Sequence, residues 1–425
     1  MRRKYLKTFF LCFSLSLGFA SAALAQAKLT ISCGSNGLER QICQSGIDAW
    51  SKKTGVKVDV FSSPNESNDR LALYQQLLGA RSADIDVYQI DVVWPGLLAN
   101  HLSDLKPHFS AAELKAHIPG ALANNQVGDK LVAIPWFTDG GVLYYRSDLL
   151  KKYGRNVPTT WQEMAETAKL ILEKEKAAGN ADLWGYVYQG RAYEGLTCNA
   201  LEWIASFGGG QLFDANGKPT FNNPQAVAAL DFVGSQTGTT VPRGTLSYSE
   251  EEARGTFQSG KAIFLRNWPY VWGLVQSPDS VVKGKVGMAA LPSGKAGGPR
   301  ASTLGGWSLA VSAHSKYPKE AADLVRYLTG AEEQKRRAIE GSFNPTRVAL
   351  YDDAAVLKKN PHLKELKPVF LSAVPRPAAQ TGAKYNRFSA DFWNAVHSVL
   401  SQSENAAQAL KKLEARVQSY AGGKG

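Results

Sequence analysis

The fold is decided by residues 28–91, KLTISCGSNGLERQICQSGIDAWSKKTGVKVDVFSSPNESNDRLALYQQLLGARSADIDVYQID. Two kinds of segment alternate there: strands are predicted at 28–33, 56–61 and 87–90, and helices at 38–53 and 68–79. A strand–helix–strand–helix–strand order implies a mostly parallel sheet with helices on both faces and right-handed crossovers. The stretch therefore predicts an α/β fold.

The same alternation continues outward along the 425-residue chain. Further strands are predicted at 131–134, 142–145, 262–265, 286–290 and 307–311, with residues 135–141 as a connection. Further helices are predicted at 161–178, 192–207, 224–235, 249–259, 318–328 and 406–421, the last ending an almost entirely helical tail. Thr160 and Glu163 predict a capping box. Because no linker interrupts a chain of this length, we expect two α/β lobes joined by chain crossings.

Residues 1–25 have the features of an export signal. A basic start precedes an apolar run at 8–19 that is too short to span a bilayer, and Ala23-Leu24-Ala25 fits a cleavage site. We predict a signal peptide cleaved near Ala25 and a periplasmic location, with Sec and twin-arginine export both open. Removing the four basic residues of the signal lowers the formal net charge from +12 to +8. The remaining Lys and Arg are spread along the chain, so we expect no nucleic-acid partner.

Three cysteines remain after removal of the signal. Cys33 and Cys43 are ten residues apart and could pair in an oxidising compartment. Closing so short a loop would stabilise the fold by about 2–3 kcal/mol. Cys198 is expected to be a buried, unpaired side chain, and the absence of a C-x-x-C motif argues against redox catalysis.

The sequence lacks the motifs of common enzyme classes. There is no phosphate-binding G-x-x-x-x-G-K-[ST], no G-x-S-x-G and no H-E-x-x-H, and the six histidines have no metal-ligand spacing. We therefore expect no catalytic residues, no metal and no cofactor.

Aromatic residues instead gather beside polar residues at the ends of predicted elements. The four clusters lie at 91–96, 135–141, 266–270 and 304–307. In open α/β sheets, ligands bind beyond the carboxyl ends of strands. A sugar ring can lie on an aromatic face while its hydroxyls bond to carboxylates, which only accept, and to guanidinium groups, which only donate. The clusters therefore indicate a saccharide site.

These clusters resemble those of the extracellular solute-binding proteins of ABC sugar importers, in particular the trehalose/maltose-binding group. The resemblance covers essentially the whole mature chain. It rests on QIDVVW (89–94), PWFTDGGVLYYR (135–146), PTTWQE (158–163), EEEARGTFQSG (250–260), NWPY (267–270), LGGW (304–307) and NPT (344–346).

The resemblance implies a set of ligand-binding residues. They are the acceptors Glu39, Asp91 and Asp139, the donors Arg70 and Arg376, the stacking platform Trp268 and Tyr270, the opposing wall Gly306 and Trp307, and Phe137, which stands where a close relative has Tyr. Structural roles remain open for several of them. Glu39 could instead be an acid in the first turn of a helix, and Asp91 could cap the helix that starts near Trp94. Asp139 could be a turn residue before Gly140. Arg70 could be a solvated charge on a helix, and Arg376 could pair with an acid on the surface.

The resemblance also implies an architecture and a mechanism. The fold is the two-lobed periplasmic-binding-protein fold of class II, with the ligand cleft between lobes that hinge crossings join. We expect one lobe at 26–136 plus 295–345 and the other at 137–294 plus 346–425. The chain would be a monomer that captures a neutral di- or oligosaccharide, such as trehalose, maltose or sucrose, and delivers it unaltered to an ABC permease driven by a cytoplasmic ATPase.

Two other functions stay open at this point. A secreted carbohydrate-active enzyme would also show aromatics and acids, and Glu39, Asp91 and Asp139 could supply the two carboxyl groups of a glycosidase. A binding protein for a charged ligand, such as a glycerol phosphodiester or a polyamine, is compatible with the basic net charge. The acidic residues of the predicted site argue against an anionic ligand.

Overall fold

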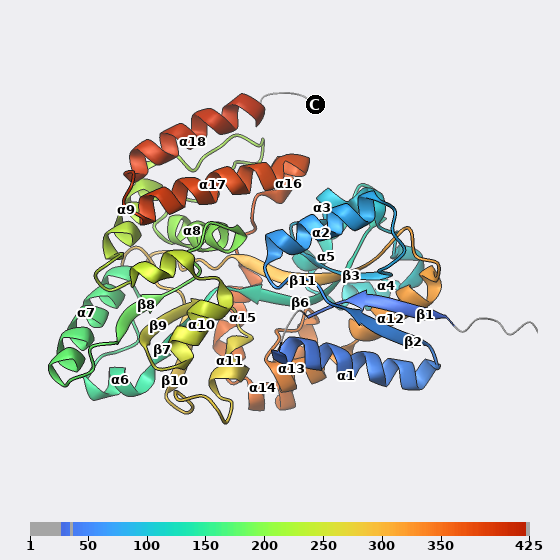
Figure 1. Ribbon diagram of the computed structural model, residues 1–425, viewed down its shortest axis with the longest axis horizontal. Coiled ribbons are helices and arrows are strands. Elements are labelled where there is room, and N and C mark those ends of the chain that lie inside the picture. Colours follow the sequence, from blue (N-terminus) through green and yellow to red (C-terminus); the bar gives the residue numbers. More distant parts are fainter. Residues whose placement is uncertain (1–26, 35–36, 422–425) are drawn as a thin grey trace, which may run out of the picture.

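The stretch 28–91 folds as predicted and builds one side of a sheet (Figure 1). The computed structural model describes residues 27–34 and 37–421. The strands β1 (Lys28–Ser32), β2 (Lys57–Phe61) and β3 (Val87–Asp91) are parallel and lie in the order β2-β1-β3. The helices α1 (Gly37–Thr54) and α2 (Ser67–Gly79) connect them and pack in different hydrophobic clusters, one on each face of the sheet.

Two strands from later in the chain complete this five-stranded sheet. β11 (Leu304–Val311) pairs with β3 and β6 (Ile134–Gly140) pairs with β11, both antiparallel. The prediction of a mostly parallel sheet is therefore confirmed, because β1, β2, β3 and β6 run in one direction and β11 runs against them. Parallel neighbours need a crossover between consecutive strands. β6 and β11 instead continue from or into the other sheet, so no crossover fixes their direction.

The second sheet has four strands in the order β10-β7-β9-β8. They are β7 (Val142–Arg146), β8 (Trp184–Val187), β9 (Ala262–Asn267) and β10 (Val286–Ala290). Only β8 and β9 run parallel, and the other neighbours are antiparallel. The sequence pattern did not predict β8, which is a short strand with a glycine inside it.

The long predicted helices form, with ends shifted by a few residues. They are α7 (Trp161–Ala177), α8 (Glu194–Ser206), α9 (Pro224–Gln236), α10 (Glu250–Gln258), α12 (Pro318–Leu328), α17 (Tyr385–Leu400) and α18 (Ala406–Ala421). The Thr160 side chain caps α7 in the predicted box with Glu163. The other α-helices and strands are α3 (Pro95–Leu98), α4 (Ala111–Lys115), α5 (Pro119–Ala123), β4 (Gln126–Val127), β5 (Lys130–Leu131), α6 (Ser147–Lys152), α11 (Val271–Val275), α13 (Ala331–Gly341), α14 (Ala354–Lys359), α15 (Leu363–Leu371) and α16 (Ala378–Thr381).

The segment 135–141 is not a connection, as the sequence suggested, but mostly the buried strand β6. Its residues pair with β11 over most of their length, which gives the backbone polar groups their partners. Trp136 is fully buried, and the guanidinium carbon of Arg337 lies 3.7 Å from its ring centre. Trp136 is therefore a core residue, whereas Phe137 and Asp139 belong to the cavity described below.

The two sheets are the centres of two lobes (Figure 1). α1 and α12 pack with the first sheet, and α7, α8, α9, α17 and α18 share a core with the second. The chain first passes between the sheets at Gly141, between β6 and β7, and it passes back between β10 and β11. The lobe boundaries 136/137, 294/295 and 345/346 stay predictions.

The cysteines are arranged as the sequence suggested. Cys33, at the end of β1, forms a disulfide with Cys43 of α1, and Cys198 of α8 is an unpaired, buried thiol. The predicted signal peptide, residues 1–25, lies outside the described residues. Within the ranges 27–34 and 37–421, no helix combines the length and the apolar character needed to cross a bilayer.

Candidate functional site

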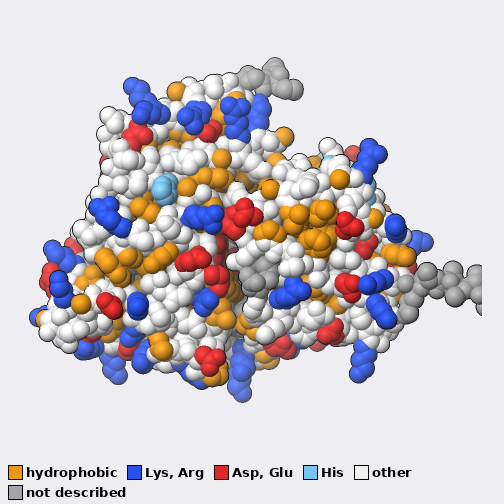
Figure 2. All heavy atoms as spheres, in the orientation of Figure 1, with side chains coloured by type: hydrophobic (Ala, Val, Ile, Leu, Met, Phe, Trp, Pro, Cys, Tyr) orange, Lys and Arg blue, Asp and Glu red, His pale blue; other side chains and the backbone are white. Residues whose placement is uncertain are grey.

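A cavity of about 230 Å³ lies where the two sheets meet. Its walls include ends of β3, β6 and β11 from the first sheet and the residues after β9 of the second. Every residue that the family resemblance implied lines this cavity: Glu39, Arg70, Asp91, Phe137, Asp139, Trp268, Tyr270, Gly306, Trp307 and Arg376. Figure 2 shows the groove between the two halves of the molecule, where acidic side chains gather.

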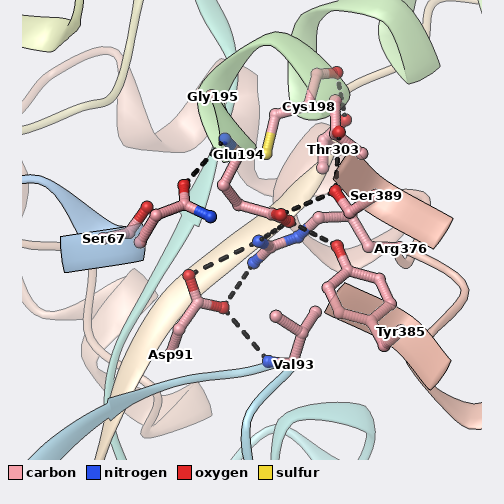
Figure 3. Close-up of polar contacts among 12 residues, drawn as sticks. Ser67, Asp91, Val93, Glu194, Gly195, Cys198, Thr303, Arg376, Tyr385 and Ser389 are labelled. Carbon is pink, nitrogen blue, oxygen red and sulfur yellow. Dashed lines mark hydrogen bonds and ion pairs between the residues drawn. The ribbon is translucent and has the colours of Figure 1, made fainter. Parts of the chain in front are cut away.

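Arg376 and Asp91 line the cavity as an ion pair. Arg376 Nη2 lies 2.6 Å from Asp91 Oδ1, and the side chains are 2% and 10% exposed. Asp91 Oδ1 also accepts from the Val93 N–H at 3.1 Å, a bond within the turn before α3. The N-cap of α3 is Trp94 and no side chain of the described residues caps this helix, so the capping role that the sequence left open for Asp91 is not found. Arg376 is therefore not a surface charge, because its side chain is buried and its partner Asp91 is buried as well (Figure 3).

Glu194 binds the other end of the Arg376 guanidinium, at 2.7 Å from Nη1. Its carboxylate also accepts from the hydroxyl groups of Tyr385 and Ser389, and its backbone N–H donates to Asn68 Oδ1 at 3.1 Å. Burial raises the pKa of Glu194, and the charge of Arg376 partly offsets this effect. Sequence reasoning did not select Glu194. The one signal was its place at the start of a predicted helix, which is common for acids.

Trp268 lies between groups of both lobes. The Arg266 guanidinium, fully buried and bonded to Glu202, is centred 4.0 Å from the ring centroid of Trp268. The ring edge lies against Gly305 of β11, where an added Cβ would be 2.9 Å from the ring. Trp268 Nε1 donates to Glu250 Oε1 at 3.4 Å. The ring is thus held from several sides at the cavity wall.

The start of α10 adds two acids that the sequence did not assign to the site. Glu250 accepts from the Tyr193 hydroxyl at 2.6 Å, and burial raises the pKa of Glu250. Glu251 accepts from the Tyr270 hydroxyl at 2.6 Å and pairs with Arg254. The signal for them was available, since both lie in the motif 250–260 that carried the resemblance.

Trp307 forms the opposite wall. The Arg70 guanidinium carbon lies 4.7 Å from the Trp307 ring centroid, and Trp94 packs edge-on at 5.4 Å. Arg70 Nε donates to the Pro64 carbonyl at 2.9 Å, so this side chain is buried and bonded rather than a solvated helix charge. Gly306 has φ +116°, and an added Cβ would lie 2.4 Å from the Phe137 carbonyl oxygen. Only glycine fits at this position of β11, because a side chain would both strain the backbone and clash with β6.

Asp139 is a buried carboxyl group aligned with Gly305 in the β6–β11 pair. Its Oδ1 has no hydrogen-bond partner among the residues that the structure describes. Burial, with the nearby negative charge of Glu39, raises the pKa of Asp139 to about 7. Arg266, Asp91 and Arg337 have smaller effects. The turn role that the sequence left open is excluded, because Asp139 lies in a strand.

Glu39 and Phe137 complete this side of the cavity. Glu39 lies in the first turn of α1 and accepts from Gln89 Nε2 at 2.9 Å. The Phe137 ring packs 4.9 Å from Phe343, which also lines the cavity. Glu39 therefore keeps both roles that the sequence allowed, a first-turn acid and a cavity carboxylate.

The lining combines aromatic rings with an excess of hydrogen-bond acceptors. The carboxylates are Glu39, Asp91, Asp139, Glu194, Glu250 and Glu251, and the guanidinium groups are Arg70, Arg254 and Arg376. Among the described residues, no group of three or more His, Cys, Asp or Glu side chains is arranged to hold a metal ion. Such a lining suits an uncharged molecule that carries many hydroxyl donors and apolar C–H faces.

Comparison with known proteins gives solved structures with the same fold. The chain is similar to maltose-bound MalE3 of T. maritima, with 39% identity, a TM-score of 0.87, and coverage of 92% of this chain and 99% of that chain. It is also similar to the GacH receptor of Streptomyces glaucescens, solved unliganded and with acarbose, with 25% identity, a TM-score of 0.81, and coverage of 93% and 98%.

Comparison at the level of sequence gives the family. A "Probable ABC transporter-binding protein" of Deinococcus radiodurans is 54% identical over 414 residues, which are 97% of this chain and 98% of that protein. The model of the bacterial extracellular solute-binding proteins matches residues 36–335. With this match and this relative, the chain belongs to the bacterial extracellular solute-binding protein family.

Proposed function

We propose that this chain captures a neutral disaccharide or short oligosaccharide, an α-glucoside such as maltose, trehalose or sucrose, for an ABC importer. The observation that carries the proposal is that every residue implied by the sequence resemblance lines one cavity between the two sheets. The similarity to a maltose-bound solute-binding protein over nearly the whole chain supports it.

The proposed binding chemistry follows from the lining. The rings of Trp268 and Trp307 stand on walls from different lobes and can receive the C–H faces of a pyranose. Asp139, Glu39 and Glu250 can accept from the hydroxyl groups of the sugar through their carboxyl oxygens. An anionic ligand would face the excess of carboxylates, which argues against a phosphodiester.

Delivery would follow from closure of the lobes around the ligand. A ligand that touches both lobes favours the closed state by its extra contacts there. In this proposal the chain acts as a periplasmic monomer, its lobes being 26–136 plus 295–345 and 137–294 plus 346–425. The closed form docks on the membrane permease, a cytoplasmic ATPase drives transport, and no cofactor takes part.

Isothermal titration calorimetry tests the proposal. The panel contains maltose, trehalose and sucrose, a glycerol phosphodiester, a polyamine and a polyol such as mannitol. We expect micromolar or tighter binding of at least one neutral disaccharide, which corresponds to about −8 kcal/mol or better. Tight binding of the phosphodiester or the polyamine, with no response to neutral sugars, would contradict the proposal.

Incubation of the chain with the bound disaccharide separates binding from catalysis. We expect the sugar to be recovered intact, because the family binds and releases its solute. Release of glucose at enzyme-like rates, abolished in an Asp139→Asn variant, would instead favour the secreted glycosidase.

A further inference from the structure

Glu194 is an extensively bonded carboxylate of the cavity wall that the sequence did not single out. Its carboxylate receives Arg376 Nη1 at 2.7 Å, the Ser389 hydroxyl at 2.7 Å and the Tyr385 hydroxyl, and it is 9% exposed. Figure 3 shows these side chains converging on the carboxylate from α17 and from the segment before α16.

The bonds of Glu194 connect the two lobes. Glu194 begins α8, which packs in the core of the second sheet. Its N–H donates to Asn68 Oδ1 in the first turn of α2, which packs on the first sheet. Through Arg376, its carboxylate is also joined to Asp91 at the end of β3. Glu194 therefore reaches the first lobe by a direct bond and by a bond through Arg376.

The backbone next to Arg376 pairs with the segment that leads into β11, through Leu304 N to Val374 O at 2.8 Å and Val374 N to Ser302 O at 2.7 Å. Thr303 of this segment is bonded to α8, since its N–H donates to Glu202 Oε1 and its hydroxyl donates to the Cys198 carbonyl. The Arg376 backbone is therefore held beside α8, and its guanidinium spans from Glu194 to Asp91 of β3. If α8 moved away from β3, the Arg376 charge would lose one of its two carboxylates and these groups would have to be rehydrated.

We propose that Glu194 is a positioning residue for closure of the cavity. It holds Arg376 against Asp91 and holds the start of α8 against α2, and so favours the arrangement in which the two walls face each other. The effect on sugar affinity rests on the proposed function. The effect on the unliganded chain does not, because the contacts involve no ligand.

The test compares Glu194→Gln with a matched control, Glu175→Gln. Glu175 also accepts from a cation and a tyrosine hydroxyl, Lys152 at 2.6 Å and Tyr153 at 2.6 Å, but all of these groups lie in the second lobe. Spin labels on the exposed positions Gln75→Cys of α2 and Lys169→Cys of α7 report the distance between the lobes by pulsed electron resonance.

We expect Glu194→Gln to shift the unliganded distance distribution toward the open state by about tenfold in population. We expect it to weaken sugar binding by on the order of 10- to 100-fold, the range of such couplings. The control variant should change neither quantity. An unchanged distance distribution in folded Glu194→Gln would overturn the proposal, whether or not the wild-type chain binds a sugar.

A second variant keeps the proposal testable if Glu194→Gln does not fold. Asn68→Ala removes only the direct bond to the Glu194 N–H, at the side of α2, and leaves the buried ion pairs intact. We expect a smaller opening in the same direction. If the Asn68→Ala variant shows the same distribution of spin-label distances as the wild-type chain, the proposal is overturned. The two proposals can fail separately. If the wild-type chain binds no neutral saccharide while the variants still shift toward the open state, the proposed function is refuted and the role of Glu194 is supported.

Discussion

Asp139 is a buried carboxyl group whose surroundings disfavour its charge. In the fold its pKa is raised from 3.8 to about 7, so the folded chain keeps this proton between these pH values while the unfolded chain has lost it. The stabilising contribution is therefore fully present below pH 3.8 and is lost as the pH rises to about 7.

The Asp139→Asn variant should remove this pH dependence. We expect the stability difference between variant and wild type to change by about 2–4 kcal/mol between pH 4 and pH 8, in favour of the variant at the higher pH. Urea unfolding of the unliganded proteins at a series of pH values measures it. Parallel pH profiles for the two proteins would show that Asp139 titrates normally.

Trp268 is the residue at which the proposed stacking is tested. We expect Trp268→Ala to weaken saccharide binding by about 1–3 kcal/mol, the range for losing an aromatic platform. Trp272→Ala is the control, since Trp272 is also half-buried but packs on His362 and does not line the cavity. Titration calorimetry measures the saccharide affinity of both variants. If the two affinities are equal, Trp268 does not contact the sugar.

At the scale of elements, the β6–β11 pair forms the wall of the cavity and needs Gly306. The register between the strands shifts after Trp307, and Gly306 adopts φ +116° next to the Phe137 carbonyl. We expect Gly306→Ala to destabilise the fold by about 1–3 kcal/mol or more, from backbone strain and the clash together. Gly96→Ala in α3 is the control, because nothing lies within 4 Å of its added Cβ. Chemical denaturation measures both, and a Gly306→Ala variant as stable as the control would contradict the prediction.

Elements also show how far the sequence pattern reaches. The helices and the strands of 28–91 could be predicted because their periodicity and caps are local, as with Thr160 and Glu163. β6 could not be predicted, because its residues carry loop-like Pro, Asp and Gly and become a strand only by pairing with β11. β8 was missed for a similar reason, since a four-residue strand is set by its neighbour β9.

At the scale of the whole molecule, the cavity couples the lobes because both contribute to its walls. A saccharide that binds only the folded, closed chain should stabilise it by about 2.7 kcal/mol at a free concentration of 100 times the dissociation constant. Calorimetric unfolding with and without the sugar measures this effect. We expect a single unfolding transition whose midpoint temperature rises when the sugar is added. Stabilisation confined to one of two separate transitions would show that the ligand touches a single lobe.

The sequence by itself determined the alternation of helices and strands at 28–91, the candidate disulfide and a set of residues that the structure brings to one cavity. These properties depend on local patterns and on motifs that can be recognised in the chain. The tertiary structure alone decided that Arg376 is bound by Asp91 and Glu194, at separations of 285 and 182 residues. It also decided that β6 and β11 run antiparallel to their neighbours. Such pairings depend on which distant segments meet in the folded chain, and no local pattern encodes that.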